Sequence, residues 1–250
     1  MGKLVGSSKK AKQAANQKTR AQSRMSSRWT TYLVRRTETL KTTWTFRAII
    51  LAGVLVVLWT TRGMWIPGVG GALVCDGSVR PSDAILVDNL EVNYLLFERA
   101  EQLKSAGIAN RVLVPTLATP GTHEPSRVFA GFAEVMSQVA RLPPPELIPV
   151  REVEPISLNA AYDIREYLRD RGIRSVVLVS PAFRSRRSAL IYGDVLGAAG
   201  IAAGCVPVFA PQQGPGTWTR TLHGIQEVAE QHVKLQYYRF YVLPYVHWRS

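Results

Sequence analysis

The stretch SVVLVSPAFRSRRSALIYGDVLGAAG, residues 175–200, contains a strand signal followed by a helix signal. Its first six residues form a short apolar run rich in valine, which favours a buried strand. Apolar residues then recur at helical spacing up to a glycine that ends the pattern: Ala189, Tyr192, Leu196 and Ala199, then Gly200. The stretch therefore predicts one strand–helix unit of an α/β fold.

The same alternation extends on both sides of this stretch. Short apolar runs predict further strands at 84–87, 111–115, 147–150 and 205–209. Helical patterns lie between and after them, at 88–107, 128–140, 157–172 and 219–241. Asp88 and Glu91 form a D-x-x-E capping box at the first helix, and Ser157 is placed to cap the third. We therefore expect an α/β, doubly wound fold with a mostly parallel sheet of about five strands.

The positive charge of the chain is concentrated at its N-terminus. The 250 residues hold 31 Lys and Arg against 18 Asp and Glu, a net charge of +13. Twelve of these basic residues and one acidic residue, Glu38, lie in residues 1–47. Charge therefore does not support a nucleic-acid-binding fold for the whole chain. Residues 1–43 have few large apolar side chains to bury and are predicted to be a disordered cytoplasmic tail; a nucleic-acid-binding arm is the alternative.

An apolar segment follows the tail. Residues 48–61 carry no charge and begin with AIILAGVLVVLW, but they are fewer than the roughly 20 residues that usually span a bilayer. Arg47 and Arg62 can snorkel at its ends, and tryptophans flank it as in an aromatic belt. We therefore expect a transmembrane helix at 44–66, which Pro67 and the following glycines end. A buried core helix is the alternative, and a cleaved signal peptide fits less well because the preceding charged region is long.

The charge asymmetry across this segment predicts a topology. By the positive-inside rule, the basic N-terminus stays in the cytoplasm. Residues 67–79 are then a linker, and residues 80–250 are a periplasmic or extracellular Rossmann-like domain of a single-pass protein in the inner (cytoplasmic) membrane. Cys75 and Cys205 would lie in an oxidising compartment and are candidates for a disulfide, with plain core packing of Cys205 as the alternative.

An arginine-rich loop follows the strand at 175–180. Ligands of doubly wound folds bind beyond the carboxyl ends of the strands, near the point where the strand order reverses. Arg184, Arg186 and Arg187 stand at the start of a helix, where positive charge is unfavourable unless an anion or a carboxylate partner is present. We expect these arginines and Ser180 to form a site for a phosphate-like anion. The alternative is that one or two of them pair with a carboxylate: Glu152, Glu154 or Asp163.

Four more polar residues are candidates for the same end of the sheet. Asp88 and Asn89 follow the first strand and could hold a ligand hydroxyl, a water or a metal, although a helix cap alone accounts for Asp88. Asn159 could point its amide into the cleft. His223 opens the last helix, where a surface or packing role is the alternative. No histidine has a second ligand at metal spacing, and no nucleotide-binding motif follows a strand, so no metal site is predicted and the cofactor stays unknown.

Several motifs occur in order over residues 80–240. They are AILV (84–87), ERAEQLKSAG (98–107), EPISLNA (154–160), VLVSPAFRSRRS (177–188) and a final W…E…KL-x-YY made of Trp218, Glu227, Lys234, Leu235, Tyr237 and Tyr238. Together with the apolar anchor, these motifs resemble the YdcF/SanA/ElyC family. The resemblance implies a Rossmann-like domain anchored at the cytoplasmic membrane. It also implies a link to envelope integrity and to lipid-carrier or peptidoglycan-precursor metabolism, without defined catalytic residues.

The chain departs from the family pattern around the expected site. Asp88-Asn89 stand where the family has a glycine pair, and residues 115–117 where it has Ser-Gly-Gly. Ala160 replaces a threonine, and Arg184 replaces the histidine of a T-S-P-x-H-x-x-R motif, whose arginine is kept as Arg187. The lost glycines argue against the family's usual ligand mode. The added arginine favours anion binding over acid–base chemistry.

These features together predict a single-pass envelope protein whose domain binds an anionic, phosphorylated envelope metabolite, such as a sugar or a lipid carrier. Membrane lipid and membrane proteins are the expected partners, and nucleic acid is disfavoured. Whether the domain is an enzyme is left open. Two alternatives remain: a non-catalytic structural or accessory subunit of a membrane complex that retains the fold, and a cytoplasmic protein with a nucleic-acid-binding basic arm.

Overall fold

The computed structural model describes residues 44–90, 92–122 and 124–245. The predicted basic tail, residues 1–43, lies outside them. The chain divides into two compact units, Met1–Val57 and Leu58–Ser250, and the second contains the whole α/β domain.

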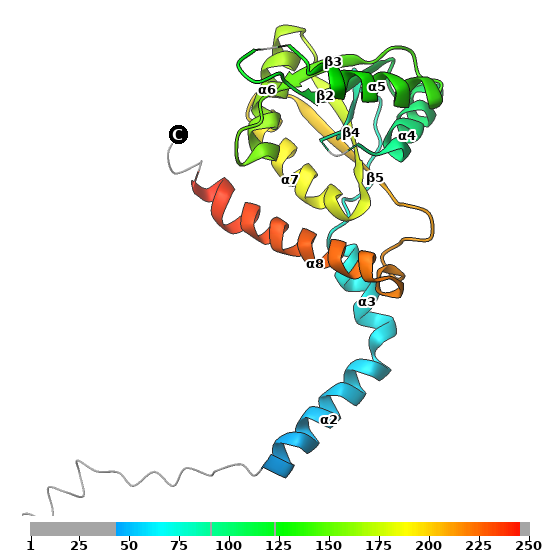
Figure 1. Cartoon of the computed structure of the whole chain (residues 1–250), viewed down its shortest axis with the longest axis vertical. Coiled ribbons are helices and arrows are strands. Elements are labelled where there is room, and N and C mark those ends of the chain that lie inside the picture. Colours follow the sequence, from blue (N-terminus) through cyan, green and yellow to red (C-terminus); the bar gives the residue numbers. More distant parts are fainter. Residues whose placement is uncertain (1–43, 91, 123, 246–250) are drawn as a thin grey trace, which may run out of the picture. The chain divides into compact units, whose positions relative to one another are not determined.

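Five parallel strands form one sheet (Figure 1). Their bounds are β1 Ala84–Val87, β2 Arg111–Leu117, β3 Glu146–Val150, β4 Ser175–Pro181 and β5 Ala202–Val208. The strand order is β3-β2-β1-β4-β5, so the chain builds outward from β1 on one side and then on the other. In register, Leu86 of β1 lies between Leu113 of β2 and Leu178 of β4. The expected α/β, Rossmann-like fold with about five parallel strands is confirmed.

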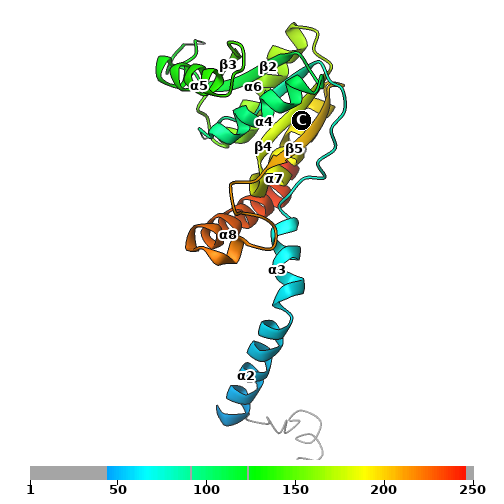
Figure 2. The ribbon, with the colours of Figure 1, turned by 90° about the vertical axis from the view of Figure 1, so that its right-hand side faces the viewer.

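Helices cover both faces of the sheet (Figure 2). They are α4 Tyr94–Ser105, α5 Arg127–Val139, α6 Ile156–Asp170, α7 Ala182–Gly197 and α8 Leu222–Tyr237; α8 follows the 3-10 turn η1 Trp218–Arg220 and continues into the π-helical turn η2 Tyr238–Val242. Alternate residues of β1 serve two cores, because strand side chains alternate in direction. Ile85 and Val87 pack towards α4 and α5, whereas Ala84 and Leu86 pack towards α6 and α7.

The starts of three helices differ from the sequence prediction. Helix α4 is capped by Asn93, whose Oδ1 accepts from the Leu95 N–H at 3.0 Å, and not by Asp88. Ser157 lies inside α6, whose N-cap is Pro155. Helix α7 begins at Ala182, so the three arginines lie in its first two turns and not in a loop. Asp88 and Ser157, which resemble local caps in the sequence, are instead bonded to Arg184 and Arg187 of α7.

Two helices precede the domain in place of the single helix predicted at 44–66. They are α2 Trp44–Thr60 and α3 Arg62–Gly71, and Pro67 lies inside α3. The prediction that Pro67 ends the helix and begins a linker is therefore wrong. Packing explains the continuation: Trp218 Nε1 donates to the Ile66 carbonyl at 2.9 Å, and His232 Nε2 lies 3.0 Å from the Val69 carbonyl.

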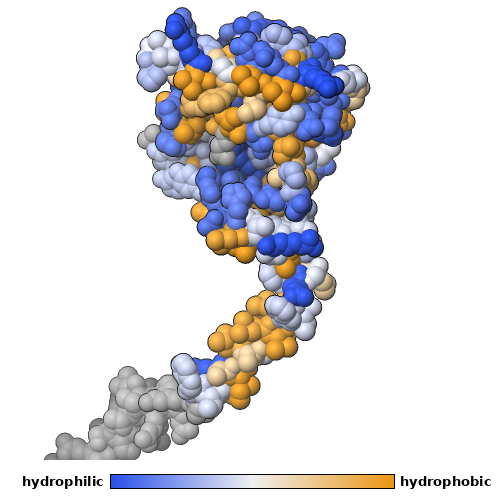
Figure 3. Space-filling model, turned by 45° about the vertical axis from the view of Figure 1, so that its right-hand side comes forward, coloured by the Kyte–Doolittle hydropathy of each residue, from blue (hydrophilic) through white to orange (hydrophobic). Residues whose placement is uncertain are grey.

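The apolar helix α2 buries none of its side chains, and Figure 3 shows its apolar surface. In the part of the chain that the structure describes, no helix taken alone has the length and apolar character to cross a membrane. The bent pair formed by α2 and α3 meets both requirements when its two helices are taken together.

A disulfide joins Cys75 to Cys205 at the start of the domain, across 130 positions of sequence. Both half-cystines are buried. The same segment is bonded to α7, because the Arg186 N–H donates to the Leu73 carbonyl at 2.9 Å and the Cys75 N–H donates to Ser185 Oγ at 2.9 Å. The residues after α3 are thus fixed against the helix that carries the three arginines.

Two helical glycines allow the packing of α8 to be tested. A Cβ at Gly224 would lie 2.3 Å from the Trp218 carbonyl oxygen, whereas a Cβ at Gly193 of α7 would meet nothing within 4 Å. Alanine at Gly193 should raise the free energy of unfolding by up to about 1 kcal/mol, the helix-propensity gain. Alanine at Gly224 should lower it by roughly 1–3 kcal/mol, because backbone must move. Denaturant unfolding of the full-length variants measures both; equal gains would contradict this packing of α8.

Candidate functional site

The strand order reverses between β1 and β4, which are neighbours in the sheet. In doubly wound folds, ligands bind beyond the carboxyl ends of the strands at this point. Here β1 is followed by Asp88, and β4 carries Ser180 near its end. The Asp88 N–H donates to the Val179 carbonyl at 2.9 Å, so the backbone pairing of the two strands continues to the edge. This places the two polar side chains together.

A buried polar cluster fills this position. The Asp88 and Arg184 side chains are 1% and 5% exposed, and Arg184 Nη2 donates to Asp88 Oδ1 at 2.7 Å. Ser180 Oγ and Ser188 Oγ donate to Asp88 Oδ2 at 2.9 and 2.7 Å. Burial acts to raise the pKa of Asp88, but the charge of Arg184 and the three hydrogen bonds outweigh it, so the pKa lies below its ordinary value. Asp88 is therefore an ionised internal anion.

This cluster gives Arg184 a carboxylate partner within the domain. The sequence left open either a bound anion or a carboxylate partner, and the structure supplies a carboxylate. The partner is Asp88, which the sequence analysis had not paired with the arginines. Ser180 is likewise bonded to Asp88.

A cavity of about 290 Å³ lies beside the cluster, between α7 and the end of α8. Its wall is made of residues from four parts of the chain: Leu90, Glu154, Pro155, Ile156, Ser157, Arg184, Arg187, Lys234, Tyr237 and Tyr238. Arg187 is buried in this wall. Its Nη1 donates to Ser157 Oγ and its Nη2 to Gln231 Oε1, both at 3.2 Å, and its guanidinium lies 5.5 Å from the centre of the Tyr238 ring.

The wall combines charge with apolar surface. Among the described residues, three basic side chains line it against one carboxylate, that of Glu154. Leu90, Ile156 and the tyrosine rings provide the apolar part. A guanidinium held in a fixed position can bind a phosphate or carboxylate with two parallel hydrogen bonds. The cavity is therefore suited to a small anion attached to a carbon group.

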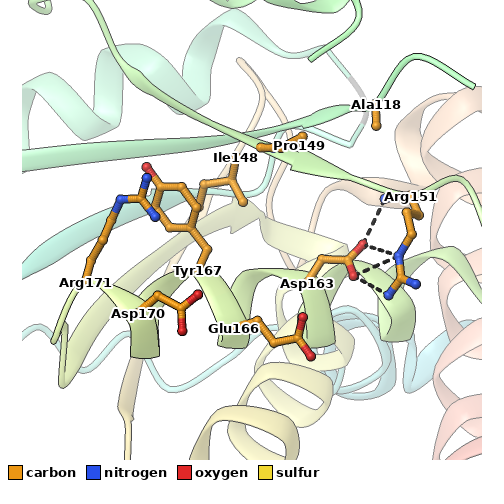
Figure 4. Close-up of a pocket in the computed structure, with 9 residues that line it drawn as sticks. All are labelled: Ala118, Ile148, Pro149, Arg151, Asp163, Glu166, Tyr167, Asp170 and Arg171. Carbon is orange, nitrogen blue, oxygen red and sulfur yellow. Dashed lines mark hydrogen bonds and ion pairs between the residues drawn. The ribbon is translucent and has the colours of Figure 1, made fainter. Parts of the chain in front are cut away.

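A groove of about 340 Å³ along β3 and α6 is a weaker candidate (Figure 4). Two of its charged side chains bind one another, because Arg151 donates to Asp163 through Nε at 3.0 Å. The Arg171 guanidinium lies 3.5 Å from the centre of the Tyr167 ring. A hollow of about 360 Å³ lies near residues 118–122. Both lie away from the switch point between β1 and β4, so we give the α7–α8 cavity priority.

The structure separates several residues that the sequence grouped. Arg186 is on the surface, where Nη1 lies 3.3 Å from Asp76 Oδ1. His223 is exposed in the first turn of α8, about 16 Å along the helix from Lys234 at 1.5 Å per residue. Asn159 does not point into the cavity, because its Nδ2 donates to the Val153 carbonyl at 2.9 Å. These three residues do not line the α7–α8 cavity.

Asn89 is buried at the end of β1, but it does not line the cavity. Its Oδ1 has no hydrogen-bond partner among the described residues, and the same holds for Thr116 Oγ1 on β2. Within residues 44–90, 92–122 and 124–245, no group of three His, Cys, Asp or Glu side chains is arranged to hold a metal ion.

The sequence analysis missed the contribution of α8. Lys234, Tyr237 and Tyr238 line the cavity, and Gln231 orients Arg187. The first three belong to the KL-x-YY motif of the family resemblance, and this motif is the signal that points to them. Neither a scan against protein-family models nor a search of curated proteins finds a match to the chain. Membership of the YdcF/SanA/ElyC family stays a prediction.

Proposed function

We propose that the α/β domain binds a phosphorylated envelope metabolite, a sugar phosphate or a lipid-carrier phosphate, in the α7–α8 cavity. The observation that carries this proposal is Arg187, a buried guanidinium in the cavity wall that Ser157 and Gln231 hold in place. Lys234 adds a second positive charge, and Tyr237 supplies apolar surface for the organic part of the ligand. Arg184 contributes indirectly, since Asp88 is its ion-pair partner.

We further propose that this domain lies outside the cytoplasm, anchored to the inner membrane by its N-terminal apolar helices as a divergent member of the YdcF/SanA/ElyC family. The disulfide between Cys75 and Cys205 supports the location, because disulfides persist in oxidising compartments. The exposed apolar side chains of α2 support the anchor, because such a surface is costly in water. The basic residues before α2 support the orientation.

A non-catalytic accessory role is the second candidate, and the buried cluster favours it. Asp88, with Arg184 and the two serines, occupies the switch point at which related folds bind phosphate. Binding of a phosphorylated compound separates the two candidates, since a purely structural subunit has no need of it.

The proposal is tested with Arg187→Ala and Arg187→Lys, using inorganic phosphate and a soluble sugar phosphate as probes in titration calorimetry. Loss of a charge-assisted hydrogen bond is worth about 1.5–3 kcal/mol, so Arg187→Ala should weaken binding roughly 10- to 100-fold. Lysine should restore little, because an ammonium cannot form the planar two-pronged contact.

Arg186→Ala is the matched control, because Arg186 belongs to the same helix but pairs with Asp76 on the surface. It should bind as the unchanged protein does. If the unchanged protein binds neither probe, anion binding is wrong and the accessory role is preferred.

A further inference from the structure

Helix α8 has two apolar faces, and the domain covers only one. The inner face is buried against α3 and α7 through Val228, Leu235 and Tyr238. The opposite face carries a second, mainly apolar row at helical spacing, interrupted by Gln226 and Gln236, which we name the outer stripe: Leu222, Ile225, Ala229, Val233, Tyr237 and Phe240. Leu222, Val233 and Phe240 are 71%, 71% and 72% exposed. An exposed row of this length marks an interaction surface.

The charges of α8 lie beside the outer stripe and not within it. At 100° per residue, Glu230 and Lys234 fall on one flank and Arg239 on the other. The basic residues Lys234 and Arg239 are balanced by Glu227 and Glu230 over Leu222–Val242. The stripe therefore has the pattern of a helix that lies in a membrane interface, driven by apolar burial and not by net charge.

The position of α8 in the fold indicates what covers the stripe. Helix α8 packs against α3, where His232 contacts the Val69 carbonyl and Gly70 lies against Trp218. Helix α3 follows the exposed apolar helix α2 directly in the chain. Figures 1 and 2 both show α8 at the end of the domain from which α3 leaves. The outer stripe thus lies on the side of α8 opposite its buried face, at the end of the domain from which α3 leaves.

The aromatic residues at the C-terminal end of α8 and just beyond it are also suited to a membrane interface. Tyr237, Tyr241 and Tyr245 form a stacked row on the surface, with ring centres 5.5 and 6.2 Å apart. Phe240 lies beside them, with the Arg239 guanidinium 5.7 Å from its ring centre. Tyrosine is enriched at membrane–water interfaces because its ring is apolar and its hydroxyl is polar.

We propose that the outer stripe of α8 lies on the lipid bilayer surface and fixes the orientation of the domain above it. This inference rests on the membrane anchoring proposed above. Tyr237 belongs both to the stripe and to the wall of the α7–α8 cavity. The cavity is therefore beside the lipid surface.

The test uses the full-length chain in phosphatidylcholine vesicles, with a nitroxide label on an introduced cysteine, Val233→Cys. The two native cysteines are joined in the disulfide, so only the new thiol reacts. Electron paramagnetic resonance then compares how a water-soluble relaxation reagent and oxygen reach the label. Val135→Cys is the matched control, because Val135 is also an exposed valine within a helix, on α5.

We expect accessibility to the water-soluble reagent to be at least about threefold lower at residue 233 than at residue 135, since an interfacial helix buries its apolar face about 5–10 Å below the headgroup boundary. Adding phosphatidylglycerol should change this ratio little, because residues 222–242 carry two acidic and two basic side chains and so have no net charge.

Three results would overturn the inference. Equal accessibility at the two labels, in protein that floats with the vesicles, would show that anchoring holds but α8 stays in water. Dipolar coupling between labels at residue 233 would show that a second copy of the chain covers the stripe. Failure to float with vesicles would remove the anchor, and the inference with it.

Discussion

Replacing Asp88 with alanine is expected to lower the free energy of unfolding by about 3–5 kcal/mol, the usual cost of breaking a buried ion pair. The variant leaves the Arg184 guanidinium buried without the carboxylate that lies 2.7 Å away in the native protein. It also removes the acceptor of Ser180 and Ser188. Urea unfolding of the full-length chain, followed by circular dichroism, measures the loss.

The chain contains a matched control for this prediction. Arg186 and Asp76 also form an ion pair, but their side chains are 46% and 81% exposed. Asp76→Ala should change the free energy of unfolding by at most about 1 kcal/mol, because water screens exposed pairs. The double variant Asp88→Leu/Arg184→Met should recover much of the loss, since it leaves no unpaired buried charge. Equal effects of Asp88→Ala and Asp76→Ala would contradict the buried cluster.

The same carboxylate should make stability depend on acid pH. The pKa of Asp88 is lower in the folded protein than its ordinary value of 3.8. Its stabilising contribution is therefore complete above about pH 5 and is lost progressively as the pH falls through 3.8 towards the folded-state pKa. Asp88→Asn should remove this part of the pH dependence, while other lowered carboxylates, such as Glu146 beside Arg111, keep theirs.

The sequence predicts the sheet well, because buried parallel strands are apolar on both faces. The run at 84–87 coincides with β1. The fifth strand begins at Ala202, ahead of the predicted 205, because its first residues, Ala202, Ala203 and Gly204, are small and give little apolar signal. Helix α3 continues past Pro67 because its contacts with Trp218 and His232 are distant in sequence. Local signals fail where packing between distant segments decides the structure.

The site is less predictable for the same reason. Asp88 with Glu91 resembles a local capping box, and a helix cap is worth about 1 kcal/mol. The bond to Arg184 joins residues 96 positions apart and is charged and buried. Such a bond contributes about 1.5–3 kcal/mol, so it outweighs the cap. The pairing of β1 with β4 brings Asp88 and Arg184 together, and the local sequence around either residue does not predict this pairing.

The contribution of α8 to the cavity also depends on tertiary structure. Lys234 reaches the cavity, and Gln231 reaches Arg187, only because α8 returns to pack against α7. Helical periodicity predicts α8 itself but does not specify which of its two apolar faces is buried. The charged residues lie on the flanks of the helix, so their positions allow either apolar face to be buried. Contacts such as that of Gly224 with the Trp218 carbonyl determine that the inner face is buried.

Removing the disulfide with Cys75→Ala/Cys205→Ala is expected to lower the free energy of unfolding by about 5 kcal/mol. This value follows from chain entropy alone for a bond that closes a sequence separation of 130. Removing the disulfide should also disturb the wall of the α7–α8 cavity. The Cys75 N–H donates to Ser185 Oγ, and Ser185 lies between Arg184 and Arg186 on α7. Phosphate binding should therefore weaken in the double variant even at temperatures where the domain stays folded.

Reducing agent provides the control for this last effect. Dithiothreitol should destabilise the unchanged protein in denaturant, where the buried half-cystines become accessible, and should leave the double-alanine variant unaffected. The hydrogen bond between the Arg186 N–H and the Leu73 carbonyl does not involve sulfur and should keep part of the segment on α7 after reduction. If the double variant is as stable as the unchanged protein, the hydrogen bond to the Leu73 carbonyl and the packing of Leu73 suffice to hold the segment on α7. The disulfide would then give no support to an oxidising location.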